Sequence, residues 1–511
     1  MRERRRRGFG IAVGLLLVAY PWIFQQPYPR DVMIRIFLYA LLAQAWNILG
    51  GYCGQVSLGS AVFFGIGAYT SSVLSLWWGV PFAGLLLSIA IVPLIANHFW
   101  HSHYGKFALA WALAFLAPFA FRSGIAVTLH EVAHVALLEY LPFVMILLAL
   151  FTIAGGISFR GTLRSSAGTN TGILALGAAL ASIMGTTGAS MLLIRPLLTA
   201  NEGRVHRAHV VVFFIVLVGN IGGALSPLGD PPLFIGFIKG IRFFWTTRAL
   251  LVPTVFLVAV LLIAFFVIDR HLFAREARPA ARIESSADRG IDGTVNILLL
   301  GAVIGAVLMS GLWKPGITVN VLGTPLELQN LLRDGLLAAI TLASLVLTPV
   351  SIRTRNAFNW GPIVEVAKIF AGIFITILPV IAILAAGDHG ALAWLATFVR
   401  TPGGGLDNEG LFWTTGVLSA FLDNAPTYLM FFNLAGGDAQ TLMGPLAAGL
   451  KAISMAAVYF GALTYIGNAP NFMIRAIAEH RGVPMPSFFG YLAWATLMLV
   501  PLLWVVGHFT L

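Results

Sequence analysis

The chain has 511 residues, of which 59% are hydrophobic and only 10% are charged. This composition excludes a soluble globular domain and indicates an integral membrane protein. The net charge of +11 is spread over loops, which argues against nucleic-acid binding, and the single cysteine, Cys53, excludes an internal disulfide framework.

Basic residues open the chain, with Arg2 and a run from Arg4 to Arg7 before the first apolar segment, Phe9–Phe24. Bulky residues follow this segment, so we expect an uncleaved anchor rather than a signal peptide. Excess Lys and Arg marks cytoplasmic loops, which places the N-terminus and the linker Arg270–Gly293 on the cytoplasmic side. We expect a multi-pass protein of a bacterial inner membrane, with the lipid bilayer and small inorganic ions as partners.

The stretch Tyr39–Ser75 has a distinctive pattern, with the words GYCGQVSLG and FFGIGAYT. It resembles the opening spans of LivM-type permeases of branched-chain amino acid ABC transporters. The resemblance ends near Trp78, and no cytoplasmic coupling loop for an ABC ATPase follows. We therefore interpret residues 1–78 as a fused fragment of about three helices. The alternative is an ABC permease subunit, which would require a partner ATPase.

Two later stretches resemble each other, and each contains an interrupted helix. The first comprises Ala178–Leu198 and Leu217–Ile238, and the second comprises Gly416–Ala435 and Tyr459–Ala478. Broken helices survive in lipid only where they line a protected cavity. Matching interruptions in two halves of a chain indicate a transporter binding site. We divide the remaining chain into scaffold helices (79–133), repeat 1 (134–269), a cytoplasmic linker (270–293) and repeat 2 (294–511).

Three segments in these repeats carry a more specific resemblance: GNIGGALSPLGDPP (Gly219–Pro232), SAFLDNAPTYL (Ser419–Leu429) and GALTYIGNAPNFM (Gly461–Met473). They are similar to NhaD-type sodium/proton antiporters, which belong to the ion transporter superfamily with the citrate and arsenite carriers. The likeness covers residues 79–511. It implies an all-α polytopic fold of two inverted repeats, each with a re-entrant hairpin and a broken helix. It also implies cation/proton exchange or carboxylate transport by an elevator-like movement, and a homodimer. Counting apolar segments, we expect about 12 to 14 membrane segments.

Asp423 is the first candidate for ion binding, because it stands with Asn424, Pro426 and Thr427 between two apolar runs. An ionisable residue at membrane depth is costly and marks an ion pathway. Pro426 is expected to end helical pairing and free backbone carbonyls. The carboxylate, amide and carbonyl oxygens would then suit Na⁺, and the same carboxylate can take a proton. The alternative is a hairpin cap, since Asp and Asn are ordinary turn residues.

Asp230 is the second candidate, and Pro231 restricts it to an extended conformation. The helix is expected to break here, so Asp230 either binds an ion or proton or caps the next half-helix. Asn220 lies ten residues earlier. The glycines around Asn220 allow close backbone approach at the break: Gly219, Gly222 and Gly223.

Corresponding polar residues complete the candidate set: Asn468 and Asn471 beside the helix-breaking Pro470, and Thr186 and Thr187 in the first hairpin. Hydroxyls, amides and half-helix N-termini suit ion or carboxylate binding, although a structural role is the alternative. Asp230 and Asp423 stand in the motif segments, where a carboxylate symporter would be expected to have neutral amide and hydroxyl groups. The residue types therefore favour exchange of Na⁺ or Li⁺ for H⁺, without a cofactor. A citrate-like carboxylate or oxyanion carrier is the alternative.

Two further patterns need an interpretation. His130, Glu131 and His134 form H-E-x-x-H, which on a helix could hold Zn²⁺ in an intramembrane protease. No downstream segment stands out as a third ligand, so zinc chemistry is retained only as an alternative. Glu365 and Lys368 are three residues apart and could pair on one helix face or take part in gating.

Overall fold

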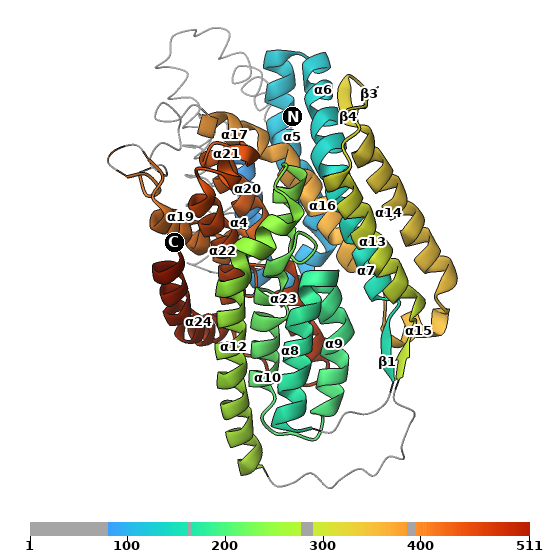
Figure 1. Cartoon of the computed structure of the whole chain (residues 1–511), viewed down its shortest axis with the longest axis vertical. Helices are drawn as coiled ribbons and strands as arrows, with labels where there is room; N and C mark the ends of the chain where they lie inside the picture. Colours follow the sequence, from blue (N-terminus) through green and yellow to red (C-terminus); the bar gives the residue numbers. More distant parts are fainter. Residues whose placement is uncertain are drawn as a thin grey trace, which may run out of the picture. The chain divides into compact units, whose positions relative to one another are not determined.

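The computed structural model describes residues 80–160, 165–276, 290–385, 395, 397–401, 403 and 405–511. These residues are mostly helical (Figure 1). Nine helices within them are long and apolar enough to cross a membrane. The predicted all-α polytopic membrane fold is thereby confirmed. The LivM-like segment, with the spans expected there, lies outside the described residues.

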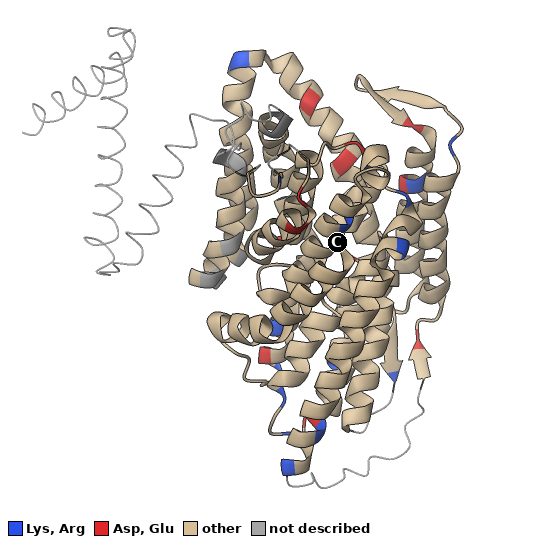
Figure 2. Cartoon of the chain, turned by 60° about the vertical axis from the view of Figure 1, so that its left-hand side comes forward, with Lys and Arg blue, Asp and Glu red and all other residues tan. Residues whose placement is uncertain are grey.

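The outer helices expose apolar side chains, as expected for contact with lipid. Helix α12 (Phe243–Arg275) leaves Val252 73% and Ile263 66% exposed, and α13 (Val295–Leu312) leaves Leu298 77% exposed. Charged residues are sparse along the described helices (Figure 2). By contrast, α10 (Ala208–Leu217) is apolar and buried around its circumference, which places it in the centre of the protein.

One group of helices, here called the scaffold, comes from two separate parts of the sequence. Helix α16 packs against α4, α5, α7 and the π-helical turn η2, and α13 and α14 pack on α7. The scaffold in the structure is therefore larger than the predicted one, residues 79–133. It also includes helices from the starts of both predicted repeats. The other bounds are α4 Val80–Ile95, α5 Asn97–Ser123, α6 Ile125–Val135, η2 Ala136–Tyr140, α7 Leu141–Ala154, α14 Leu328–Leu347, α15 Val350–Arg355, α16 Gly361–Thr376 and α17 Leu378–Ala385.

A second group, here called the core, contains one hairpin and one broken helix from each repeat. In each hairpin two helices pack against each other, α8 on α9 and α19 on α20. In each broken helix a 3₁₀ turn and a short irregular stretch of turns or bends separate the two halves. The first repeat supplies α8 Ala167–Met184, α9 Thr186–Ala200, α10, η3 Ile221–Leu225 and α11 Pro231–Ile238. The second supplies α19 Asn408–Leu422, α20 Asn424–Leu434, α22 Ala447–Phe460, η5 Gly461–Leu463 and α23 Ala469–His480.

The linker differs from the loop expected over residues 270–293. Helix α12 continues to Arg275, because Arg204 pairs with Asp269 at 2.5 Å and with Glu276 at 3.3 Å and so fastens its charged end. Residues 290–292 form a short strand. The remaining elements are α21 Ala439–Met443, α24 Phe488–Thr510, β1 Ser158–Arg160 antiparallel to β2 Gly290–Asp292, and β3 Thr318–Val321 antiparallel to β4 Thr324–Glu327.

Candidate functional site

The two hairpins break at equivalent residues. Helix α8 gives way to α9 at Gly185, where φ is +82°, and α19 gives way to α20 at Asp423, where φ is +78°. These residue numbers differ by 238, as do those of the broken-helix segments GALSPLGDPP (223–232) and GALTYIGNAP (461–470). One spacing therefore relates both the hairpins and the broken helices of the two repeats.

Equivalent hydrogen bonds fasten each broken helix to its hairpin. The hydroxyl of Ser226 donates to the carbonyl oxygen of Ser182, and the hydroxyl of Thr464 donates to that of Ala420. Both pairs again differ by 238 in residue number. A Ser or Thr at the start of each irregular stretch thus supplies a hydrogen-bond donor to a carbonyl oxygen near the end of the first hairpin helix.

The predicted break glycines allow close backbone approach in the first repeat. A Cβ atom on Gly222 would lie 2.6 Å from the backbone of Ala178, and one on Gly223 would lie 2.6 Å from the methyl carbon of Thr186. Gly219 would meet the carbonyl oxygen of Ile215 at 2.7 Å. Larger residues at Gly222 and Gly223 would separate the broken helix from the hairpin, and one at Gly219 would clash with α10 itself.

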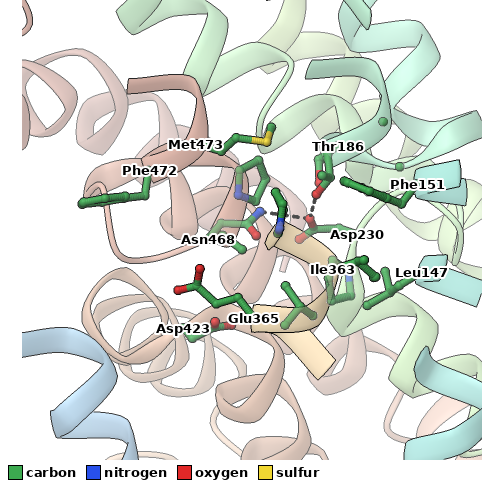
Figure 3. A pocket seen from close by; sticks show the side chains of 18 of the residues that line it. Leu147, Phe151, Thr186, Asp230, Ile363, Glu365, Asp423, Asn468, Phe472 and Met473 are labelled. Atoms are coloured by element: carbon green, nitrogen blue, oxygen red, sulfur yellow. Dashed lines mark hydrogen bonds between the residues drawn. The ribbon is translucent and has the colours of Figure 1, made fainter. Parts of the chain in front are cut away.

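Asp230 occupies the N-cap position of α11, with the extended backbone that Pro231 requires, but its carboxylate makes no cap hydrogen bond. Instead, Oδ1 accepts from the hydroxyl of Thr186 at 3.1 Å and from the amide of Asn468 at 3.0 Å (Figure 3). Oδ2 accepts from the amide of Asn424 at 2.6 Å. Thr186 begins α9, Asn424 begins α20 and Asn468 occupies the N-cap position of α23. One carboxylate therefore links four half-helix beginnings.

Buried amides continue this network behind Asp230. Asn468 also donates to Oδ1 of Asn220 at 3.2 Å, and Asn220 donates to Oδ1 of Asn471 at 2.7 Å. Asn471 in turn donates to the carbonyl oxygens of Gly461 and Thr464, both at 2.8 Å. Asn220 and Asn471 thus connect the two broken helices and fix their relative position.

Asp423 combines the two roles considered for it. Its Oδ1 accepts from the backbone N–H of Ala425 at 3.2 Å, so it caps α20, and its side chain also lines a cavity (Figure 3). A non-glycine residue in this sparsely populated backbone region costs about 1–3 kcal/mol, which Gly185 avoids at the equivalent position. A strained residue retained where glycine would fit points to a role beyond capping.

Asn424 carries a buried acceptor without a donor. Its Oδ1 receives no hydrogen bond from the described residues. In this structure the amide nitrogen of Asn424 lies 2.6 Å from Oδ2 of Asp230. If the amide were turned around, its oxygen would take that position, and the two oxygens would repel each other while Asp230 is charged. The site therefore includes one amide oxygen whose acceptor capacity is unused.

The cavity has a volume of about 380 Å³ and lies between the core and the scaffold. Asp230, Asp423 and Glu365 all line it, and Glu365 points into it from α16 (Figure 3). Sequence reasoning assigned Glu365 no place in the site, although an acid in an apolar helix is itself a signal. Among the described lining residues there is no Lys or Arg. The remaining lining is mainly apolar, and its other polar members include Thr186, Thr187 and Asn468.

A family model described as "Putative citrate transport" (CitMHS_2) matches residues 71–511. The chain belongs to this family. It is therefore a transporter of the citrate-carrier kind, and the expected relation to citrate carriers is confirmed. The narrower likeness to NhaD-type antiporters and the LivM-like N-terminus stay predictions. No curated protein matches the chain.

One side chain of this transporter acts differently from the prediction. Pro426 does not end a helix, because it is the third residue of α20, where its missing N–H would have no intrahelical partner. The break is made by the backbone of Asp423. Thr427 donates its hydroxyl to the carbonyl oxygen of Asp423 at 2.7 Å, so it closes the first turn of α20. Pro231 and Pro470, as expected, stand at the beginnings of the second half-helices.

The H-E-x-x-H segment of the transporter lies in α6. The rings of His130 and His134 are 6.3 Å apart between centroids. Within the described ranges, no group of three or more His, Cys, Asp or Glu side chains could hold a metal ion. The zinc alternative, with Glu131 as base, therefore has no third ligand in this part of the chain.

Proposed function

We propose that this transporter exchanges Na⁺ or Li⁺ for protons, with Asp423 and Asp230 as the carboxylates that take either. The observation that supports this most is their burial beside one cavity: Asp423 is 9% and Asp230 1% exposed. The described lining offers them no Lys or Arg as a counter-charge. A buried carboxylate in such surroundings is favourable only when it is protonated or accompanied by a cation.

The amide of Asn424 supports both states of Asp230. While Asp230 is charged, Asn424 donates to it, as in this structure. Once Asp230 is protonated, its O–H requires an acceptor, and a turn of the amide presents the Oδ1 that lacks a donor among the described residues. Proton uptake can then proceed without a change in the backbone of the four half-helices.

Competition at these carboxylates would couple the two ions. A carboxylate that holds a proton loses the charge that attracts Na⁺, and a carboxylate beside Na⁺ binds a proton less readily. If the core carries either form across the membrane by moving relative to the scaffold, exchange follows.

The test is proton movement in everted vesicles of an antiporter-deficient bacterium that produces the chain. Respiration acidifies the vesicles, and added Na⁺ or Li⁺ should collapse this pH gradient in the wild type. Asp423→Asn should abolish the response at an equal amount of membrane protein. Asp438→Asn is the matched control, because Asp438 is an exposed N-cap on α21 and Asn also caps well. The control should respond as the wild type does, and a full response in Asp423→Asn would refute the proposal.

A second candidate, a citrate-like carboxylate carrier, is favoured by the family description and by a cavity larger than a bare ion needs. Because the described lining contains acids and no Lys or Arg, a di- or tricarboxylate would have to arrive protonated or with cations. Uptake of labelled citrate into proteoliposomes separates the two functions. Citrate uptake without cation-driven proton movement would replace the exchange proposal.

A further inference from the structure

A third carboxylate, that of Glu365, approaches the cavity from outside the core. Glu365 lines the same cavity as Asp423 and Asp230, and its side chain points into it (Figure 3). The indole N–H of Trp100 on α5 donates to its Oε1 at 3.2 Å, and Trp100 is only 3% exposed. Lys368, the residue expected to pair with it, lies with its ammonium 5.6 Å from the ring centre of Tyr104.

Scaffold contacts determine the position of α16. The hydroxyl of Tyr140 in η2 donates to the carbonyl oxygen of Ala367 at 3.1 Å. Phe370 stacks on Phe143 of α7 with ring centres 4.5 Å apart. Gly372 lies so close to α5 that an added Cβ would be 3.0 Å from that of Ala108. The scaffold therefore positions Glu365, whereas the hairpins and broken helices of the core position Asp423 and Asp230.

Glu365 does not complete a metal-binding group with the two aspartates. Within the described ranges no three acidic side chains lie close enough to hold one ion. A carboxylate in the same apolar cavity still attracts a cation over several ångströms, because interactions there are weakly screened. Its effect would be on the approach of the cation rather than on its final coordination.

We propose that Glu365 is a receiving carboxylate, fixed to the scaffold, that draws the transported cation into the cavity in the orientation seen here. The inference rests on the proposed exchange function. Alternating access moves one part of a transporter relative to another, so Asp423 and Asp230 change sides with the core while Glu365 stays with the scaffold. Glu365 should therefore assist cation binding from one face of the membrane only.

The test measures the cation KM of Glu365→Gln from each face, in everted and in right-side-out vesicles. Gln keeps an acceptor for Trp100 and removes the charge. We expect the KM to rise about tenfold from one face and to stay within about twofold of the wild type from the other, with the maximal rate little changed. Glu365→Asp, which keeps the charge, should restore most of the affinity.

Glu202→Gln is the matched control, because it removes an exposed carboxylate that does not line the cavity. It should leave the KM within about twofold of the wild type at both faces. If Glu202→Gln raises the KM as much as Glu365→Gln does, the effect is not specific to the cavity and the inference is overturned. An unchanged KM in Glu365→Gln, or an equal rise at both faces, would overturn it as well.

These outcomes are distinguishable from a failure of the proposed function. If the wild type moves no protons in response to cations from either face, the exchange proposal fails and this inference fails with it. If the wild type responds and Glu365→Gln behaves identically, only the inference about Glu365 is lost.

Discussion

Gly185 and Asp423 occupy equivalent positions at the breaks of the two hairpins, with φ of +82° and +78°. Glycine adopts this backbone without a steric penalty, whereas a residue with a side chain costs about 1–3 kcal/mol. The first repeat thus has the residue that suits the backbone best, and the second has a carboxylate that lines the cavity. Substitutions at these two equivalent positions should therefore affect stability and exchange in opposite ways.

Asp423→Gly should abolish exchange and leave the protein folded. Loss of the cap on α20 and relief of the positive φ act in opposite directions, so the free energy of unfolding should change by less than about 1 kcal/mol. Thermal unfolding in detergent and vesicle assays measure the two effects. Gly185→Ala is the control with the opposite pattern, because it adds a side chain at φ +82° and should destabilise by about 1–3 kcal/mol while exchange continues. Exchange by Asp423→Gly would remove Asp423 from the mechanism.

Asp230→Asn should also fold but fail to exchange. Asn can keep Oδ1 as the acceptor for Thr186 and Asn468, and Asn424 can turn its amide to accept from the new N–H₂. We expect a loss of stability of no more than about 1–2 kcal/mol. In Asp230→Asn/Asn424→Ala that acceptor is missing, so the double variant should be less stable than the single one. Equal unfolding temperatures for the two variants would show that Asn424 does not adapt in this way.

The apparent KM for Na⁺ should fall as the pH rises. This is expected because protons and Na⁺ compete for the same carboxylates. For each proton that must leave before Na⁺ binds, the apparent affinity for Na⁺ can rise by up to about tenfold per pH unit. Initial rates across a pH series in proteoliposomes provide the measurement. A KM that stays constant while the maximal rate changes would argue against competition at a shared site.

Asp269→Asn should destabilise the protein by about 3–5 kcal/mol, because it leaves the fully buried Arg204 without its main counter-charge. Asp269 also lies 2.8 Å from Nε2 of His209 and accepts from Asn170 at 2.9 Å. Unfolding temperatures in detergent measure this effect.

Glu202→Gln is the control for Asp269→Asn, because it removes an exposed pair with Arg481. It should cost less than about 0.5 kcal/mol. If both variants unfold at the wild-type temperature, the buried pair contributes little to stability.

The sequence by itself determined the membrane class and indicated the segments of the two repeats in which helices break. The chain has apolar runs long enough to span a membrane, with Gly and Pro at matching positions in two of its parts. Because unpaired backbone groups are costly in lipid, such runs favour helices that break only inside the protein. It also singled out Asp423 and Asp230 as candidates for ion binding, since charges at membrane depth are rare. These inferences depend on local composition and spacing, which a single chain displays.

Only the tertiary structure decided which of these residues meet. Thr186, Asn424 and Asn468 come from three separate segments, and their shared partner Asp230 is evident only once the four half-helix beginnings converge. The sequence predicted a helix break at Pro426, but the break lies at Asp423. Pro426 does not break the helix because a proline is well accommodated in the first turn. From the sequence, Glu365 was expected to pair with Lys368 or to take part in gating, and it was not placed in the site. Only the packing of the scaffold against the core brings its carboxylate to the cavity.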